Sequence, residues 1–461
     1  MPLPEDFIAR LHQALGDEGL LRDSSETWNY GYDNSRRHAA PELVALPASH
    51  DQVASVVQLC NEFAIPLTAR GRGTGTTGAS VPLRGGVILS TERMNRILKM
   101  DPANRYMVVE PGVTNQQVQE AAGEHGFFWP PDPTSAAYCS IGGNLAYNSA
   151  GPRAIKYGTP RENTFGLRAV TGEGHSIRTG VYTTKGVVGY DLTRLLIGSE
   201  GTLAIITEAT LKLTPLPQTK RTVQVIYRDI DCAARAVSAI MAQPVVPCAL
   251  EFMDGKAIAM IRDYSEADLP VDAGALLMIE VDGSEASIQH DLDAVCAAAS
   301  NEGMLQLNRA ETEAQIRALW QTRKALSPAL RTIAPKKINE DVVVPVSNMP
   351  ALINGLDKLA EQFAITIVNF GHAGNGNIHV NLLANPDNVD EMQRAHQCLD
   401  AVFTLVLELD GTLSGEHGVG IEKQEFVGRE IDPVTLELMR RIKSQFDPKG
   451  ILNPGKMFPT V

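Results

Sequence analysis

The stretch RGRGTGTTGASVP, residues 70–82, follows the strand-like segment IPLTA and decides the fold expected for this chain. Its four glycines, Gly71, Gly73, Gly75 and Gly78, allow neighbouring backbone N–H groups to turn inward together. Such a nest of N–H groups binds a pyrophosphate without the help of bulky side chains. Taken alone, the stretch predicts either a phosphate-binding loop or a tight glycine-rich turn.

Two later segments are rich in the same small residues. One runs from Pro130 to Gly158 (PPDPTSAAYCSIGGNLAYNSAGPRAIKYG), and the other runs from Ile197 to Leu213 (IGSEGTLAIITEATLKL). Small side chains let main-chain groups approach a flat ring system, and Ser140, Asn144 and Asn148 can form hydrogen bonds with it. Each segment alone could be an ordinary loop, but the order and spacing of all three segments are hard to attribute to chance.

Length and composition limit the function classes that remain. The 461 residues exceed what one hydrophobic core usually organises, which predicts two domains or one domain with a large insertion. The formal charge of −13 disfavours nucleic acid and anionic lipid as partners. The six cysteines are scattered singly without a C-x-x-C pair, so we expect neither a zinc knuckle nor a redox dithiol, and a reducing cytoplasm is the predicted location.

Neither a secretory signal nor a membrane span is predicted. The N-terminal MPLPEDFIARLHQALGDEGLL is acidic and amphipathic, lacks the basic and apolar regions of a signal peptide, and predicts a helix. No window approaches the roughly 18 uninterrupted apolar residues of a membrane-spanning helix. We therefore expect a soluble chain, with contact at the surface of the inner membrane left open.

The order of the predicted elements indicates a mixed α/β architecture, because short β-rich runs alternate with helical stretches in the first half of the chain. From about Asp132 to Gly201, dense glycine, serine and asparagine predict loops laid over a scaffold rather than regular elements. Prolines in LKLTPLPQTKRT mark a boundary near residue 217, and Ala-rich helical segments follow it. From about Ile365, the strand-like ITIVNFGHAG and IHVNLLAN precede a long helix.

Three of the ten histidines fall within two short motifs in the last hundred residues. In GHAGNGNIHVNLL, His372 and His379 are seven residues apart across a Gly-rich turn, a spacing that can bring two imidazoles together at one end of a hairpin. Glu416 of SGEHGVG could supply a third ligand, and two imidazoles with one carboxylate suit zinc, manganese or iron. His417 would then be available as a base. The alternative is that each histidine is a satisfied turn or core residue.

Several polar residues could bind a substrate near this set. Arg323 in LWQTRKALSPALR could pair bidentately with a carboxylate, or could be a solvated arginine on a helix face. If IHVNLL is a strand, Asn381 points to the same face as His379, and its amide could bind the substrate or have only a structural role. Lys336 and Lys337 could anchor a second carboxylate, although basic residues before a strand are usually solvated.

Over nearly its whole length, the sequence resembles the FAD-linked D-2-hydroxyacid dehydrogenases of the vanillyl-alcohol oxidase superfamily, a group that includes D-lactate, D-2-hydroxyglutarate and glycolate dehydrogenases. The family's pyrophosphate loop resembles RGRGTGTTG, and its isoalloxazine-facing segment resembles PPDPTS followed by SIGGN and NSAG. Its adenine-side segment resembles GSEGTLAIIT, and its closing flavin-domain segment resembles NPGK. Because residues 70–82 contain no histidine that could tether the flavin, we predict non-covalent FAD.

The resemblance implies the residues that contact FAD, the metal and the substrate. FAD-binding residues are expected in the segments just named: Arg70, Gly71, Arg72, Gly73, Thr74, Gly75, Thr76, Gly78, Ala79, Pro131, Asp132, Pro133, Thr134, Ser135, Ser140, Gly142, Gly143, Asn144, Asn148, Gly151, Gly201, Ile206 and Asn453. Ligands of zinc or manganese are expected at His372, His379 and Glu416. The expected catalytic residues are His417, Arg323 and Asn381.

The expected fold is α+β, with a two-part FAD-binding domain of the vanillyl-alcohol oxidase type and an inserted substrate domain of antiparallel sheet and helices. We expect the FAD-binding domain over residues 1–217 and the substrate and metal domain over residues 218–420. Residues 421–461 are expected to return to the FAD-binding domain.

The predicted activity is oxidation of a small D-2-hydroxy acid to the 2-oxo acid. Hydride leaves carbon readily only as negative charge accumulates on the hydroxyl oxygen. A divalent ion that chelates the hydroxyl and carboxylate, with His417 as the base, would therefore favour hydride transfer to flavin N5. The 2-hydroxyglutarate enzymes carry a lysine and a threonine where this chain has Asn339 and Ser327, which favours D-lactate.

Three alternatives stay open at the level of sequence. The chain could be a D-2-hydroxyglutarate dehydrogenase, a metal-independent FAD alcohol oxidase of the same superfamily, or a non-enzymatic flavin-binding subunit of a larger oxidase. The electron acceptor could be a quinone, a cytochrome or an electron-transfer flavoprotein. The sequence decides neither the metal nor whether the chain forms a homodimer.

Overall fold

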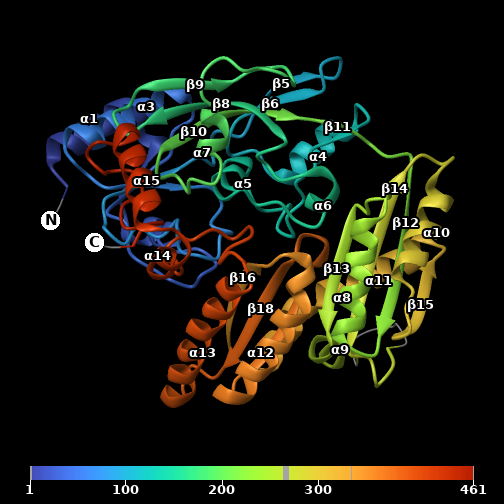
Figure 1. Cartoon of the computed structure of the whole chain (residues 1–461). Coiled ribbons are helices and arrows are strands. Elements are labelled where there is room, and N and C mark those ends of the chain that lie inside the picture. Colours follow the sequence, from blue (N-terminus) through green and yellow to red (C-terminus); the bar gives the residue numbers. More distant parts are fainter. Residues whose placement is uncertain (1–2, 263–268, 334, 460–461) are drawn as a thin grey trace. The chain divides into compact units, whose positions relative to one another are not determined.

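The structure is a computed structural model that describes residues 3–262, 269–333 and 335–459 (Figure 1). The chain divides into two compact units. The first comprises Met1–Gly151, Gly158–Leu216 and Glu416–Val461, and the second comprises Pro152–Tyr157 and Pro217–Gly415. The larger part of the second unit is therefore a single insertion into the first.

Within its described residues, the first unit contains two main β-sheets and a short strand pair. Its strands are β1 (Leu20–Leu21), β2 (Leu43–Ala45), β3 (Leu67–Arg70), β4 (Val87–Ser90), β5 (Ile97–Asp101), β6 (Tyr106–Val109), β7 (Phe127–Phe128), β8 (Thr164–Thr171), β9 (Ser176–Gly180), β10 (Ala204–Lys212) and β11 (Thr214–Pro215). One sheet has the order β1-β2-β4-β3, in which β2, β4 and β3 are parallel. The other has the order β5-β6-β10-β8-β9 and is antiparallel.

Helices cover these sheets and close two apolar cores. They are α1 (Glu5–Leu15), α2 (Ser24–Thr27), α3 (His50–Glu62), α4 (Asn115–Gly123), α5 (Ile141–Tyr147), α7 (Leu192–Leu196), α14 (Val427–Glu430) and α15 (Pro433–Phe446). Helix α3 begins at Ser49, whose hydroxyl accepts a hydrogen bond from the N–H of Gln52. Its buried side chains join those of α1 and the parallel strands in one core, and α4 and α5 pack on the antiparallel sheet in the other.

In the part of the chain that the structure describes, the second unit is built on an antiparallel sheet of seven strands. The strands are β12 (Thr219–Tyr227), β13 (Ala249–Asp254), β14 (Ala275–Gly283), β15 (Met304–Ala310), β16 (Lys336–Val343), β17 (Thr366–His372) and β18 (Asn377–Ala384). Their order is β15-β12-β14-β13-β17-β18-β16. Strands β13, β17 and β18 are therefore neighbours, although β13 and β17 are far apart in the sequence.

Among the described residues, the helices that accompany this sheet are α6 (Ala154–Tyr157), α8 (Ile230–Ala242), α9 (Gly255–Ile261), α10 (Ile288–Ala299), α11 (Glu313–Ile333), α12 (Met349–Phe363) and α13 (Val389–Glu408). Side chains of α9 and α11 share an apolar core with residues of β13, β14 and β17. This packing sets α11 against the strands on which the candidate site is built.

The predicted α+β class is confirmed, but the prediction for residues 132–201 is wrong. Residues 132–201 are not only loops, because they contain α5, α6, β8, β9 and α7. The apolar side chains of Ile141 and Leu145 are fully buried, which stabilises α5 despite its glycines. Among the helices of the described residues, none combines the length and apolar character that a membrane span needs.

Candidate functional site

The first two glycine-rich segments lie side by side within the first unit. The loop of residues 71–82 begins where β3 ends, and Ser140 stands at the N-terminus of α5. A Cβ atom added to Gly71 would lie 2.5 Å from Ser140 Oγ, closer than real Cβ atoms come to a neighbour. The loop backbone therefore approaches α5 this closely only because residue 71 has no side chain.

The hydroxyl of Ser140 is a candidate group for binding a ligand. Its Oγ is buried and has no hydrogen-bond partner among the described residues, and it does not cap α5. A buried hydroxyl without a partner is costly, so a hydrogen-bonding ligand here would remove a penalty. A pocket of about 400 Å³ lies at the start of the loop, lined by Arg70, Gly71 and Arg72 and also by Glu26 and Glu92. The exposed Arg72 and the Ser140 hydroxyl offer a cation and a hydrogen-bonding group to a cofactor that carries phosphate and polar ring atoms.

The third segment is hydrogen-bonded to the C-terminal segment of the same unit. That C-terminal segment contacts residues 71–82, the predicted phosphate loop, because the N–H of Ile421 donates to the Thr77 carbonyl oxygen at 2.8 Å. The carboxylate of Glu200 accepts hydrogen bonds from the N–H groups of Val419 (2.6 Å) and Gly420 (2.8 Å). The amide of Asn453 donates to the Glu200 carbonyl oxygen at 2.7 Å. Burial raises the pKa of Glu200, although these N–H donors oppose the shift. Glu200 of the GSEG motif therefore fixes the backbone at Val419 and Gly420.

A buried lysine completes this network. The Nζ atom of Lys456 donates to the Ala79 carbonyl oxygen at 3.1 Å and to Asn453 Oδ1 at 2.7 Å. Burial lowers the pKa of Lys456 to about 8, although Asp33 and Glu200 act in the opposite direction. The ammonium charge of this residue is therefore maintained at a cost to stability.

The low pKa of Lys456 predicts a dependence of stability on pH. Below pH 8 both the folded and the unfolded chain carry the proton, and the cost of burying the charge is fully present. Between pH 8 and about 10.5 the folded state has lost the proton and the unfolded state has not, so stability rises with pH. Over this pH range, we expect the free energy of unfolding of the wild type to rise by about 3 kcal/mol more than that of Lys456→Met, as measured by urea unfolding. Equal pH slopes in the two proteins would contradict the expectation, and replacement of the exposed Lys449 by methionine is the control.

The side chains of some predicted cofactor-binding residues are hydrogen-bonded or packed against other parts of the protein. The guanidinium of Arg70 donates to the Tyr32 carbonyl oxygen at 2.6 Å, and Asn144 Oδ1 accepts a hydrogen bond from Asn115 Nδ2 at 3.3 Å. Ile206 belongs to the apolar core of the antiparallel sheet. The remaining predicted residues lie on the glycine-rich segments, in α5 or near the C-terminus: Arg72, Gly73, Thr74, Gly75, Thr76, Gly78, Ala79, Pro131, Asp132, Pro133, Thr134, Ser135, Gly142, Gly143, Asn148, Gly151, Gly201 and Asn453.

In the second unit, β17 and β18 form the hairpin that the histidine spacing predicts. The turn consists of a 3-10 segment, Ala373–Asn375, followed by Gly376 in the left-handed region at φ 69°. The antiparallel register places His372 opposite Asn377, so His379, two residues further on, lies on the same face of the hairpin. The two imidazole centroids are 5.3 Å apart and the rings are nearly perpendicular.

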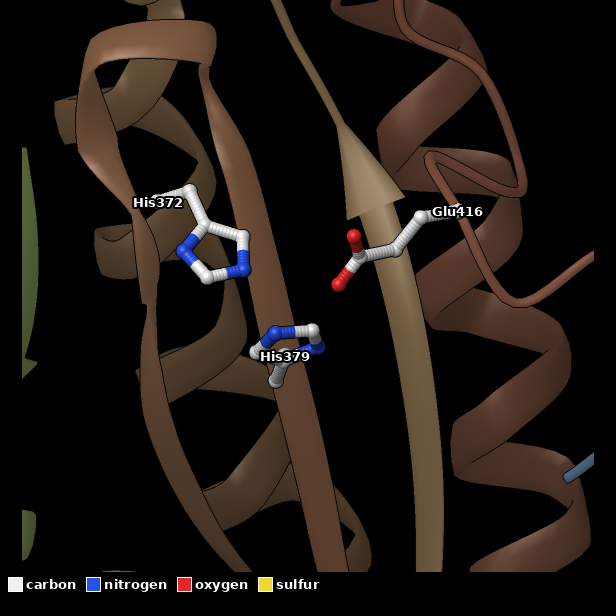
Figure 2. A group of neighbouring side chains, drawn as sticks. All are labelled: His372, His379 and Glu416. Atoms are coloured by element: carbon white, nitrogen blue, oxygen red, sulfur yellow. The ribbon is translucent and has the colours of Figure 1, made fainter. Parts of the chain in front are cut away.

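Figure 2 shows the three predicted metal ligands turned toward one another. One ligand-capable atom from each of His372, His379 and Glu416 lies within 4.8 Å of the other two. Glu416 follows Gly415, whose N–H donates to the main-chain oxygen and to the carboxylate of Asp341, each at 2.9 Å. Asp341 on β16 is the register partner of His379, which explains why the segment ends beside the hairpin. Two imidazole nitrogens and a carboxylate oxygen at this spacing fit a divalent ion such as zinc or manganese.

A carboxylate that the sequence interpretation missed supports His372. Glu251 lies on β13, opposite His372 in the register, and its side chain is 1% exposed. Its Oε1 atom is 2.5 Å from His372 Nδ1, and its Oε2 accepts a hydrogen bond from Arg323 Nε at 2.9 Å. Burial alone would raise the pKa of Glu251, but the neighbouring His372 and Arg323 outweigh it, so the pKa is lowered. The sequence feature that could have identified Glu251 is its position as the acidic residue inside the apolar run CALEFM.

Arg323 is not a solvated arginine on a helix face. Only 14% of its side chain is exposed, and its guanidinium lies over the ring of Phe370 at 4.6 Å from the centroid. The ring of Phe370 is in turn 5.7 Å from that of His379. Arg323 is therefore placed beside the histidine hairpin, with its Nε bonded to Glu251.

His417 lies in the segment held by Glu200 in the first unit. Its carbonyl oxygen accepts a hydrogen bond from Thr77 Oγ1 of the phosphate loop at 3.3 Å. The next residue, Gly418, has φ 82° and lies so close to Tyr147 and Glu200 that a Cβ would meet both within 2.7 Å. These contacts fix the backbone of His417 against the loop expected to hold the cofactor.

The amide of Asn381 is engaged inside the sheet. Its Nδ2 donates to the carbonyl oxygens of Val368 (3.0 Å) and His379 (2.9 Å), and its Oδ1 accepts from Asn339 Nδ2 at 2.7 Å. These bonds favour the structural role that was weighed for this residue.

The other substrate-binding candidates lie at the edge of the same sheet or outside the described atoms. Lys336 and Lys337 begin the edge strand β16 and are partly exposed. The side chain of Ser327 lies outside the part of the chain that the structure describes.

Comparisons with known proteins match two family models to this chain. A family model described as the FAD binding domain matches residues 41–180. A second, described as FAD linked oxidases, C-terminal domain, matches residues 216–457.

Curated relatives match almost the whole chain. The glycolate oxidase subunit GlcD of Bacillus subtilis (strain 168) is 38% identical over 457 residues, which cover 99% of this chain and 97% of the relative. The D-lactate dehydrogenase [cytochrome], mitochondrial, of Arabidopsis thaliana is 32% identical over 465 residues, which cover 99% of this chain and 81% of the relative.

Among solved structures, p-cresol methylhydroxylase with substrate bound has a TM-score of 0.79 at 20% identity, covering 98% of this chain and 96% of that one. At this identity the likeness concerns the fold alone. The predicted FAD-binding fold is thereby confirmed as a two-domain fold like that of p-cresol methylhydroxylase.

Proposed function

This chain belongs to the FAD-linked oxidases, and we propose that it is an FAD- and divalent-metal-dependent dehydrogenase that oxidises a D-2-hydroxy acid to the 2-oxo acid. The proposed substrate is D-lactate or a similarly small acid, since relatives are named glycolate oxidase subunit and D-lactate dehydrogenase. A quinone, a cytochrome or an electron-transfer flavoprotein is the proposed electron acceptor.

The proximity of His372, His379 and Glu416 is the observation that carries the proposal. A chain that only bound flavin would not need two buried imidazoles and a carboxylate within 4.8 Å of one another. Three protein ligands leave coordination positions for substrate oxygens, as in catalytic metal sites. A 2-hydroxy acid offers both a hydroxyl and a carboxylate oxygen to such a site.

In the proposed reaction, His417 and Arg323 have different roles. When bound, FAD accepts a hydride and the divalent ion polarises the hydroxyl oxygen. The imidazole of His417 takes the hydroxyl proton on a ring nitrogen, which allows the hydride to leave from the same carbon. Arg323 carries the positive charge that pairs with the substrate carboxylate through guanidinium N–H groups other than Nε, which is bonded to Glu251.

The proposed FAD site is the cradle between the phosphate loop and α5. There the backbone N–H groups of residues 71–78 would bind the pyrophosphate, and Ser140 Oγ, which has no partner among the described residues, would supply a hydrogen bond. Lys456 holds the loop through the Ala79 carbonyl oxygen, and Asn453 Oδ1 accepts a hydrogen bond from the same ammonium group.

Gly71→Ala tests this cradle. The added methyl would lie 2.5 Å from Ser140 Oγ, so either the loop or Ser140 must move, and we expect FAD affinity to fall about tenfold or more. The next atom near this methyl is Gly143 N at 3.8 Å, so adding Ser140→Ala should restore part of the affinity. FAD binding is measured by flavin fluorescence, and Gly428→Ala is the control because a Cβ there meets nothing within 4 Å. Unchanged FAD affinity in Gly71→Ala would place the cofactor elsewhere.

A substrate screen tests the proposed function as a whole. Purified protein is assayed with D- and L-lactate, glycolate, malate and 2-hydroxyglutarate, using an artificial dye as electron acceptor, before and after treatment with EDTA. We expect reduction of the dye with small D-2-hydroxy acids, loss of activity after EDTA, and recovery when manganese or zinc is restored.

Other outcomes of the screen point to the other functions considered. Hydrogen peroxide production without a need for metal would identify an alcohol oxidase instead. Preference for 2-hydroxyglutarate would change the substrate class but not the mechanism. A yellow protein that oxidises none of the acids would indicate a flavin-binding subunit.

A further inference from the structure

Glu251 is a fully enclosed carboxylate whose two oxygen atoms serve two different residues of the proposed site. It lies near the middle of β13, between β14 and β17, and is 1% exposed. A charge removed from water is tolerated only if partners compensate for the lost hydration. The partners of Glu251 are His372, 121 residues away in the sequence, and Arg323, 72 residues away.

The bond to His372 determines which nitrogen of that imidazole can bind a metal. The carboxylate of Glu251 faces the guanidinium of Arg323 and is therefore an acceptor, so His372 Nδ1 must be the donor of the 2.5 Å bond. In a neutral imidazole, a proton on Nδ1 leaves the lone pair on Nε2. Figure 2 shows that one ring nitrogen of His372 faces the side of Glu416 while the other is turned away.

The second oxygen of Glu251 fixes the position of Arg323. The guanidinium is held by two contacts, the 2.9 Å bond to Glu251 and the face of the Phe370 ring at 4.6 Å. A planar group held by one edge and one face has little rotational freedom left, so its remaining N–H groups point in a fixed direction.

We propose that Glu251 is a positioning residue that sets both the metal-binding tautomer of His372 and the orientation of Arg323. One carboxylate thereby aligns the metal ligand with the group that pairs with the substrate carboxylate. The inference rests on the proposed function, because it assigns His372 to the metal and Arg323 to the substrate.

The test compares Glu251→Gln with Glu280→Gln in the full-length, FAD-loaded protein. Glutamine keeps the shape of the side chain but replaces one carboxylate oxygen with an NH₂ group. Either His372 Nδ1 or Arg323 Nε then loses its acceptor. Glu280 is a matched control, because it is also buried, lies on the adjacent strand β14, and bonds Thr222 and Trp320 instead of the proposed ligands. Metal is removed with EDTA, and Mn²⁺ binding is then measured by titration calorimetry.

We expect Glu251→Gln to bind Mn²⁺ about 10- to 100-fold more weakly than wild type, with unchanged FAD content. The absorption spectrum of bound Co²⁺ should change in the same variant, because the orientation of one ligand changes. Glu280→Gln should match wild type in both measurements. Wild-type Mn²⁺ affinity in Glu251→Gln, or an equal loss in Glu280→Gln, would overturn the inference.

A second measurement does not depend on the folding of Glu251→Gln or on metal. In metal-free wild-type protein labelled with ¹⁵N-histidine, His372 should show a proton on Nδ1, assigned by the loss of its signal in His372→Gln. A proton on Nε2 instead would overturn the role of Glu251. If wild-type protein bound neither Mn²⁺ nor Zn²⁺, the proposed metal-dependent function would fail, and the NMR result would still decide whether Glu251 holds His372.

Discussion

His417→Ala should abolish most turnover while leaving the protein yellow and loaded with metal. A positioned general base contributes about 10²- to 10⁴-fold to rate, so kcat should fall by a factor of this size. FAD and metal content should stay at wild-type levels, because neither the proposed cradle nor the group of His372, His379 and Glu416 includes this imidazole. The measurements are dye reduction with D-lactate, flavin absorbance and elemental analysis.

The pH profile separates a base from a merely structural histidine. If His417 accepts the proton, the acidic limb of kcat/KM should disappear in His417→Ala, and activity should recover in part with added imidazole. His50→Ala is a suitable control, because His50 is also buried in the first unit but bonds Thr207. Loss of flavin colour in His417→Ala would show that this residue supports the cofactor and would reject its role as a base.

Glu416→Ala should remove metal and activity together. It leaves two imidazoles without the carboxylate that brings negative charge to the site, so we expect metal binding to weaken by far more than tenfold and turnover to fall with it. Addition of excess Mn²⁺ should restore part of the activity. The metal content is measured by elemental analysis after gel filtration.

The neighbouring Glu422 provides the control for Glu416→Ala. Glu422 forms an ion pair with the exposed side chain of Arg37 at 2.7 Å and lies six residues further along the same segment. Glu422→Ala should keep metal and activity, since exposed ion pairs contribute little. Unchanged metal content in Glu416→Ala would remove Glu416 from the ligand set, and the proposal would then lack its third ligand.

The histidine hairpin could be predicted because its determinants are local. The seven-residue separation of His372 and His379 and the glycines between them require a tight turn. At Gly376 a Cβ would lie 1.9 Å from the Val344 carbonyl oxygen, so the turn can close only with glycine at this position. Strand periodicity then places both imidazoles on one face without any knowledge of the remaining sheet.

The segment of residues 132–201 was harder to interpret, because composition and packing act in opposite directions there. Gly142 and Gly143 disfavour a helix by roughly 1 kcal/mol each, yet α5 forms because Ile141 and Leu145 are buried in the core. The strand Thr164–Thr171 did carry a signal in its β-branched residues, which the surrounding glycines obscured.

The sequence by itself determined the glycine-rich loop after β3, the membership of the FAD-linked oxidases and the identities of the ligand-capable residues, since these depend on motifs that can be read along the chain. Only the tertiary structure decided how those residues are paired. It joined Arg323 to Glu251 instead of leaving it solvated, enclosed the amide of Asn381 within the sheet, and gave His372 its carboxylate partner. The physical reason is that β13 and β17 become neighbours only when the seven-stranded sheet assembles, and a buried charge takes its partner from whichever strand the register sets opposite it.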